Sequence, residues 1–287
     1  DFMIVLGKRQ ILYVVKKVDF GVYLAEKSAV GMEEPEEKVL LPKKQVPENI
    51  LMGDELEVFI YRDSMDRLIA TVQEVLIERE QTAVLNVADT SRIGAFLDWG
   101  LEKDLLLPFK EQTMPVKKGD QCLVALYEDK SHRLCATMKV YPYLHVQSPY
   151  RLNDTVKGRV YEISKRFGVF VAVDDQYSAL IPAKEAQGNY RVNDILELRV
   201  TQVKEDGKLN VSARKKAYVQ LEEDAHMVLE KMEAAGGVLF LDDKSDPALI
   251  QKSLGISKAA FKRAAGHLKK EGKISLEPGK IVIKKTK

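Results

Sequence analysis

The side chains that most often carry catalysis are scattered along this sequence. Its four histidines stand in separate contexts, and none has a second histidine four residues away or a cysteine at motif spacing. There is no glycine-rich phosphate loop, no nucleophile elbow and no paired His-Glu signature. We therefore interpret all four as surface or capping residues: His132, His145, His226 and His267.

Aspartates and cysteines offer little more chemistry. Cys122 and Cys135 lie in one repeat unit on strands expected to be buried, so we interpret them as core residues rather than a disulfide or metal pair. The sequence predicts a protein that is not an enzyme and has no metal or cofactor. Four aspartates could hold a magnesium ion for RNA cleavage, but all fall in expected turns, where aspartate is favoured for backbone reasons: Asp63, Asp66, Asp174 and Asp175.

A pattern of short blocks recurs three times along the chain. The first block of each copy contains a glycine, and these glycines are 73 and 74 residues apart. An apolar pair with a proline, a turn into an alternating strand, and a last strand follow in the same order each time. A fixed period is typical of a repeated structural unit. The first blocks are Phe20–Leu24, Ile93–Leu97 and Phe167–Val171.

The third unit shows its strands most clearly. Its apolar and polar residues alternate as in half-buried strands. Five short strands in about seventy residues predict a small closed barrel of the OB type, a common nucleic-acid platform. The expected strands are Thr155–Ile163, Phe167–Val173, Tyr177–Ile181, Leu196–Val203 and Lys208–Ala213.

The aromatic residues of the repeated block need a special backbone to act together. Phe167 and Phe170 are three residues apart, so on an ideal strand they face opposite ways. A bulge or kink at Gly168 would bring both to the surface. One buried and one exposed ring is an equal alternative, and the same two readings apply to Phe20 with Tyr23.

The third unit resembles the S1-type RNA-binding domain, named after ribosomal small-subunit protein S1. The first two units follow the same order more loosely. The resemblance implies that Phe167 and Phe170 stack on bases of single-stranded RNA, while Lys165, Arg166 and Arg214 suit phosphates. It rests on four blocks that span nearly the whole unit: Val156–Val160, Phe167–Val171, Leu180–Pro182 and Asp206–Ser212.

Each unit also departs from the family pattern. Many members carry a histidine after the apolar pair, where this chain has Pro42, Pro108 and Pro182. The first aromatic of the second unit is Ile93, which leaves Phe96 with Trp99 as a possible substitute for stacking; a buried tryptophan is the commoner outcome. The first unit keeps Phe20 and Tyr23 as candidate RNA-binding residues. Its acidic run 33–37 is either a solvated loop or a repulsive flap.

Charge is distributed unevenly along the chain. The overall net charge of +2 conceals nets of −5 for residues 1–80, 0 for 81–150, +4 for 151–217, −5 for 218–254 and +8 for 255–287. Basic charge attracts a polyanion and supplies counterion release. We therefore expect the third unit and the C-terminal segment to contribute most to RNA binding, and the first unit least.

The C-terminal segment changes to helical periodicity. Apolar groups from Tyr218 to Met232 recur at three and four residue steps, and Asp246 and Ser257 are expected to cap two further helices. A hairpin with a Pro-Gly turn follows, which predicts a winged helix. We expect nucleic-acid contact by its third helix and wing, with a solvated lysine face or a protein-docking wing as the alternative. The contact residues would be Lys258, Lys262, Arg263, Lys269 and Lys280, with Lys284, Lys285 and Lys287 nearby.

The expected fold class is β followed by α+β: three tandem five-stranded OB-fold barrels and a winged helix. The domains are predicted at 1–76, 77–145, 146–217 and 218–287. This order is similar to that of the bacterial conserved virulence factor B family, which implies a post-transcriptional regulator in the cytoplasm without a cofactor. We expect a monomer that binds single-stranded RNA and does not enter a membrane. The alternatives are a scaffold that docks a nuclease or ribosomal partner, and duplex DNA binding by the winged helix.

Overall fold

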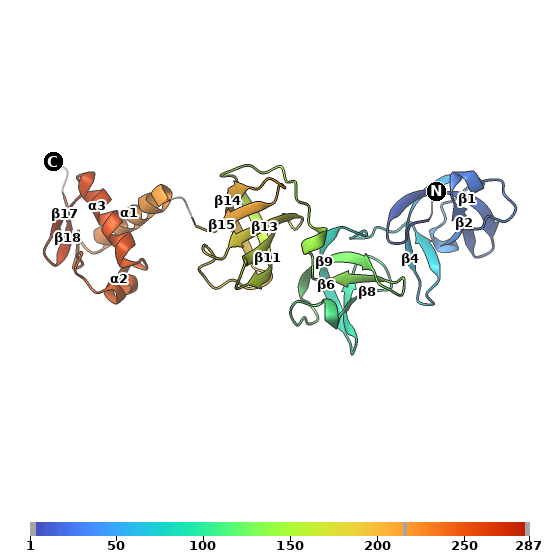
Figure 1. The fold of residues 1–287 in the computed structure, drawn as a ribbon, viewed down its shortest axis with the longest axis horizontal. Coiled ribbons are helices and arrows are strands. Elements are labelled where there is room, and N and C mark those ends of the chain that lie inside the picture. The colour runs from blue at the N-terminus through green and yellow to red at the C-terminus, as the bar shows by residue number, and fades with distance from the viewer. Residues whose placement is uncertain (1–3, 215–216, 285–287) are drawn as a thin grey trace. The chain divides into compact units, whose positions relative to one another are not determined.

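The computed structural model describes residues 4–214 and 217–284 and divides into two compact units, 1–213 and 214–287. The first unit consists of three five-stranded β domains, here called barrels 1, 2 and 3, which follow one another in sequence (Figure 1). The second unit contains three helices and a small sheet. The predicted fold class is confirmed.

Barrel 1 is a closed sheet in which the third strand pairs with the fifth in parallel, at Leu40 and Ile69. Its core is sealed by valine, leucine and isoleucine side chains that alternate along the strands. Short 3₁₀ turns follow the second and third strands, at Lys27–Ala29 and Lys43–Gln45. The strands are β1 (Arg9–Val18), β2 (Gly21–Ala25), β3 (Val39–Pro42), β4 (Glu55–Arg62) and β5 (Leu68–Thr71).

Barrel 2 has the same strand order, although the described residues show no hydrogen-bonded ladder between its third and fifth strands. Its core continues into barrel 1, because Phe59 of β4 packs with Trp99 and Ile77. The two domains therefore share one hydrophobic cluster. The strands are β6 (Thr82–Thr90), β7 (Gly94–Asp98), β8 (Leu105–Pro108), β9 (Gln121–Glu128) and β10 (Leu134–Thr137), with a 3₁₀ turn at Phe109–Glu111.

Barrel 3 is closed by a parallel pairing of Ala179 with Leu209. It meets barrel 2 through a second small cluster, in which Tyr161 packs with Val140 and Leu144. A 3₁₀ turn at Tyr141–Tyr143 lies in the connection between them. The strands are β11 (Thr155–Ser164), β12 (Gly168–Val173), β13 (Tyr177–Pro182), β14 (Ile195–Val203) and β15 (Leu209–Ser212).

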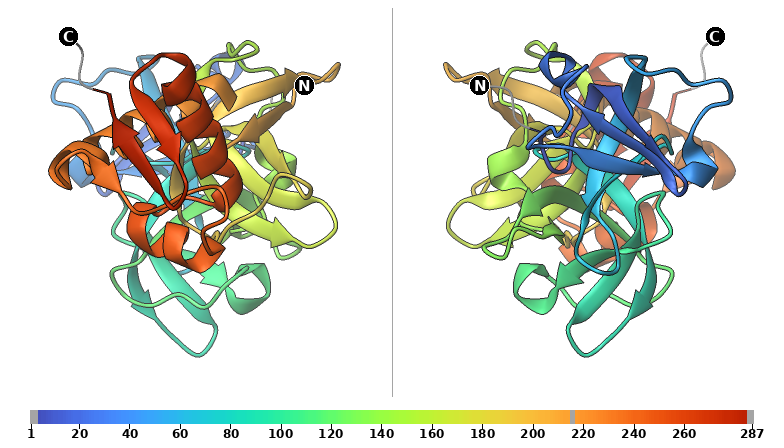
Figure 2. Two further views of the ribbon diagram at one scale, coloured as in Figure 1. Left: turned by 90° about the vertical axis from the view of Figure 1, so that its left-hand side faces the viewer. Right: turned by 90° about the vertical axis from the view of Figure 1, so that its right-hand side faces the viewer.

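The second unit has the predicted order of a winged helix. The two expected caps are confirmed, because Asp246 accepts a hydrogen bond from the Ala248 amide at 2.7 Å and Ser257 accepts one from the Ala260 amide at 3.2 Å. Figure 2 shows the terminal hairpin beside α3. The elements are α1 (Ala217–Ala234), β16 (Val238–Leu239), α2 (Pro247–Leu254), α3 (Lys258–Lys270), β17 (Ile274–Glu277) and β18 (Lys280–Ile283).

Candidate nucleic-acid interface

Barrel 3 presents the predicted pair of aromatic rings on one outer face. Phe167 is 52% exposed and Phe170 is half-buried, and their ring centroids are 6.3 Å apart. Phe170 packs against a small buried cluster that contains Tyr161 and Ala172, so the structure lies between the two alternatives, with one exposed and one partly covered ring. Tyr161 occupies the buried position, with its ring 6.1 Å from that of Phe170.

The backbone at Gly168 explains how two residues three apart share this face. Phe167 lies in the turn before β12, so strand alternation does not apply to it. Gly168 has a φ of +119°, and a Cβ there would lie 2.0 Å from the carbonyl oxygen of Ile181. The irregularity expected at this point is thus a glycine kink in β12, while the bulge itself lies on β11 between Val160 and Glu162.

Cations surround the two rings. The Arg166 guanidinium lies 5.1 Å from the centroid of Phe167, a cation–π contact, and Lys165 is exposed beside it. Arg214 is also exposed, but it belongs to the second unit, so its role stays a prediction.

Three residues that sequence reasoning did not select complete this face. Tyr141, Lys204 and Lys208 line a groove of about 520 Å³ together with Phe167 and Phe170. The Tyr141 ring meets Phe170 edge to face at 5.8 Å between centroids. Lys208 lies inside the S1-type block Asp206–Ser212, so the sequence pattern contained a signal for it. Tyr141 comes from the connection that precedes the barrel, where no such pattern marks it.

Barrel 1 has the same aromatic pair, but its cations are occupied. Phe20 is 57% exposed and Tyr23 is half-buried, with 6.3 Å between their ring centroids. Lys38 lies 5.4 Å from the Tyr23 centroid, and Glu34 binds Lys38 at 3.1 Å and Lys16 at 3.6 Å. The hydrogen bond from Lys38, followed by the charge of Lys16, lowers the pKa of Glu34. Glu34 of the acidic loop therefore neutralises Lys38 and Lys16.

Barrel 2 requires one correction. Trp99 is only 3% exposed, its ring meets Phe59 of barrel 1 edge to face at 5.7 Å, and its Nε1 donates to the Lys103 carbonyl at 2.7 Å. A ring covered in this way cannot stack on a base, so the prediction for Trp99 is wrong. Phe96 is half-buried and stays a candidate, beside Ile93 at 59% exposure.

In the winged helix, the buried side chains of α3 point into the domain and its lysines point outward. Phe261 and Leu268 are buried, whereas Lys262, Arg263 and Lys269 are exposed. The other two candidates, Lys258 and Lys280, are half-buried. Lys280 also forms an ion pair with Glu277 at 3.2 Å. Lys284 is exposed, and Lys285 and Lys287 lie outside the described residues.

The aspartates considered for magnesium binding are all engaged by other side chains. Asp63 binds Arg67 at 2.8 Å, Asp66 binds Arg133 at 3.1 Å and Asp175 binds Arg159 at 2.7 Å. The Tyr150 hydroxyl donates to Asp174. Within residues 4–214 and 217–284, no group of three or more His, Cys, Asp or Glu is placed to hold a metal ion. No helix in this described part is long and apolar enough to cross a membrane.

Comparison with known families agrees with this architecture. Residues 6–73 and 81–139 match the S1 domain, residues 144–215 match the second domain of virulence regulatory factor CvfB, and residues 226–282 match the CvfB-like winged helix domain. A curated relative, the protein YitL of Bacillus subtilis, is 33% identical over 97% of this chain and 94% of its own length. The chain belongs to the conserved virulence factor B family.

Another curated relative and a solved structure align with most of this chain. Conserved virulence factor B of Staphylococcus epidermidis is 28% identical over 87% of each chain. A crystal structure of a Streptococcus pneumoniae multidomain protein with nucleic acid binding domains is 26% identical, with a TM-score of 0.47 over 97% of this chain and 98% of that one. The matched domain types support a nucleic-acid-binding regulatory protein, and the conserved virulence factor B family is not a known enzyme family.

Proposed function

We propose that this member of the conserved virulence factor B family is a non-enzymatic protein that binds single-stranded RNA. It acts as a cytoplasmic, monomeric, post-transcriptional regulator of gene expression. The name of the staphylococcal relatives is the reason to include virulence genes among its targets. No cofactor enters this function, because stacking and phosphate contact need only side chains.

The observation that carries the proposal is the open aromatic face of barrel 3. Phe167 is half exposed, Phe170 lies 6.3 Å from it, and Lys204 and Lys208 line the same groove. Unpaired bases can stack on such rings, whereas the bases of a duplex are stacked on each other and are not accessible. The lysines and Arg166 supply contacts to the flanking phosphates.

Binding of a fluorescein-labelled single-stranded RNA tests this proposal by anisotropy. Because each base that stacks on an aromatic contributes about 1–3 kcal/mol, the double variant Phe167→Ala/Phe170→Ala should bind at least about tenfold more weakly. Ile195→Ala is the control, since Ile195 is 51% exposed on β14 of the same barrel but does not line the groove. Equal affinities for both variants and the parent would overturn the proposal.

The winged helix supports a second candidate function, the docking of a protein partner. A groove between α3 and the β17–β18 hairpin is lined by three carboxylates and three lysines, so its charge does not favour a polyanion. A peptide with both signs of charge fits this groove better than a phosphate backbone does. The charged lining residues are Asp242, Asp243, Glu277, Lys244, Lys262 and Lys280.

The exposed cations of α3 decide between RNA and protein at this domain. If RNA lies along α3, Lys262→Glu and Lys269→Glu should each lower RNA affinity several-fold at low salt, because each places a negative charge beside phosphate. Lys252→Glu on α2 is the control for net charge, as Lys252 is also exposed. Equal effects of all three variants would favour the protein-docking candidate.

A further inference from the structure

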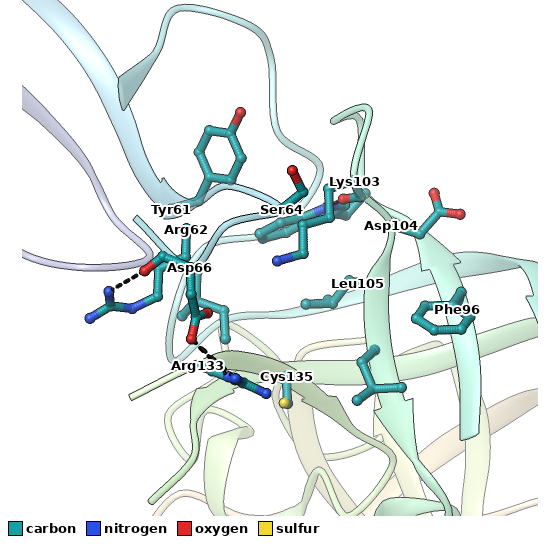
Figure 3. A pocket seen from close by; sticks show the side chains of 13 residues that line it. Tyr61, Arg62, Ser64, Asp66, Phe96, Lys103, Asp104, Leu105, Arg133 and Cys135 are labelled. Atoms are coloured by element: carbon teal, nitrogen blue, oxygen red, sulfur yellow. Dashed lines mark hydrogen bonds and ion pairs between the residues drawn. The ribbon is translucent and has the colours of Figure 1, made fainter. Parts of the chain in front are cut away.

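A cleft of about 270 Å³ lies where barrel 1 meets barrel 2 (Figure 3). One wall is the outer face of barrel 2, with Phe96 and Leu106. The opposite wall belongs to barrel 1, with Arg62 at the end of β4 and Ser64 in the turn that leads to β5. The site thus draws residues from two adjacent domains, and Arg62 and Ser64 of barrel 1 lie outside the repeated blocks.

The cleft occupies the same place on barrel 2 as the aromatic groove does on barrel 3. Phe96 pairs with Leu106 across β7 and β8, as Phe170 pairs with Leu180 across β12 and β13. A basic residue stands just before the last strand in both, Arg133 in barrel 2 and Lys208 in barrel 3. Barrel 1 therefore covers the face of barrel 2 that corresponds to the aromatic groove of barrel 3, and leaves a cleft between them.

Two cations of the cleft are held by main-chain carbonyls. Arg62 donates from Nε to the His132 carbonyl at 2.8 Å and from a terminal nitrogen to the Asp66 carbonyl at 2.9 Å. Lys103 donates to the Asp63 carbonyl at 3.0 Å. Over the described ranges, neither cation has a carboxylate within ion-pair distance, so each keeps its charge available to an anion while its position is fixed.

Two carboxylates also line the cleft, and among the described residues neither forms an ion pair with Arg62 or Lys103. Asp66 is engaged by Arg133 at 3.1 Å, as the dashed line in Figure 3 shows. Burial, followed by the charge of Asp98, raises the pKa of Asp104, which lies on the side of the cleft near Phe96 (Figure 3). Arg62 and Lys103 are therefore the side chains best placed for a phosphate.

We propose that this cleft is a composite site for one nucleotide of single-stranded RNA, with the base against Phe96 and Leu106 and the phosphate on Lys103 and Arg62. The inference rests on the proposed function and adds that barrel 1, despite its acidic charge, supplies part of the binding surface of barrel 2. An RNA strand bound to barrel 3 that extends to this cleft gains affinity through multivalency.

A pair of neighbouring substitutions on the barrel 1 turn tests the site in the full chain. Ser64 lines the cleft, whereas Met65, the next residue, is 71% exposed and does not. Ser64→Glu and Met65→Glu add the same charge to the same turn, so long-range repulsion of RNA is alike in both. We expect Ser64→Glu to weaken binding of a labelled single-stranded RNA of about 20 nucleotides, long enough to reach more than one barrel, by about fivefold or more. Met65→Glu should change it less than twofold.

The result separates the cleft from the barrel 3 site. Equal affinities of the Ser64→Glu and Met65→Glu proteins would overturn the cleft, and the proposed function would still stand if Phe167→Ala/Phe170→Ala binds more weakly. A loss with Ser64→Glu but none with the barrel 3 variant would support the cleft and overturn the barrel 3 face. Absence of RNA binding by the unaltered chain would overturn both. A midpoint temperature of thermal unfolding equal to that of the unaltered protein confirms that each variant is folded.

Discussion

The Lys208 ammonium group donates a hydrogen bond to the Tyr141 hydroxyl at 3.1 Å and lies 5.3 Å from the centroid of the same ring. This contact ties the connection between barrels 2 and 3 to the aromatic face of barrel 3. The hydrogen bond to Tyr141, followed by the one to Asp206, raises the pKa of Lys208. The lysine is therefore fully charged at neutral pH and stands next to Tyr141 at the groove.

Tyr141 should contribute to RNA binding through its ring more than through its hydroxyl. We expect Tyr141→Ala to lower affinity for single-stranded RNA about five- to tenfold, since a stacking surface is lost. Tyr141→Phe keeps the ring and loses one exposed hydrogen bond, so its affinity should fall less than about threefold. Anisotropy with one labelled RNA measures both. A Phe variant as weak as the Ala variant would argue against stacking on this ring.

Gly168 should be intolerant of any side chain. A Cβ at this position would lie 2.0 Å from the Ile181 carbonyl oxygen and 2.7 Å from the Ala183 amide nitrogen, both of which are backbone atoms. We expect Gly168→Ala to destabilise the first unit by about 3 kcal/mol or more in urea unfolding. Gly266→Ala on α3 is the control, because no heavy atom beyond its own helix backbone and chain neighbours lies within 4 Å of its added Cβ, and alanine is the better helix former by about 1 kcal/mol. Unchanged stability of the Gly168 variant would contradict the kink.

Local patterns predicted the fold well because its elements are marked by local residues. The glycine block of each barrel, the alternation within β11 and the caps at Asp246 and Ser257 depend on neighbours within a few residues. Strand β16 is the exception, as its two residues, Val238–Leu239, are too few to show any period and pair only with β18.

The site was predicted less completely because its surroundings come from other domains. Trp99 is buried by Phe59, which is 40 residues earlier in the chain and in another barrel, so no spacing rule could reveal it. Tyr141 reaches Phe170 only because its 3₁₀ turn packs on barrel 3. The exposure of Phe167 likewise depends on the φ of Gly168, which sequence spacing left open between two alternatives.

Glu34 should act as a local competitor of RNA phosphate on barrel 1. It binds Lys38, whose ammonium lies over the Tyr23 ring, and Lys16, which pairs with Tyr23 across β1 and β2. We expect Glu34→Gln to raise affinity for single-stranded RNA about twofold at low salt, and the gain should vanish at high salt because these charges are exposed. Glu36→Gln removes the same charge from the same exposed loop and serves as the control. Equal gains in affinity in both variants would show that the gain comes from the change in net charge and not from the release of Lys38 and Lys16.

The two cysteines should be inert in the folded protein. Burial, followed by the charge of Asp120, raises the pKa of Cys122 from 9.0 to about 11, and burial with Asp129 does the same for Cys135. Both thiols are therefore protonated at about pH 8, and a disulfide reagent should react with them only as fast as the protein unfolds. The folded pKa values exceed the unfolded ones, so stability is unaffected below pH 9.0 and falls as the pH rises from 9.0 to about 11. Denaturant added at the end of the measurement serves as the control, because unfolding exposes both thiols to the reagent. Reaction of the folded protein within seconds at about pH 8, before denaturant is added, would contradict this burial.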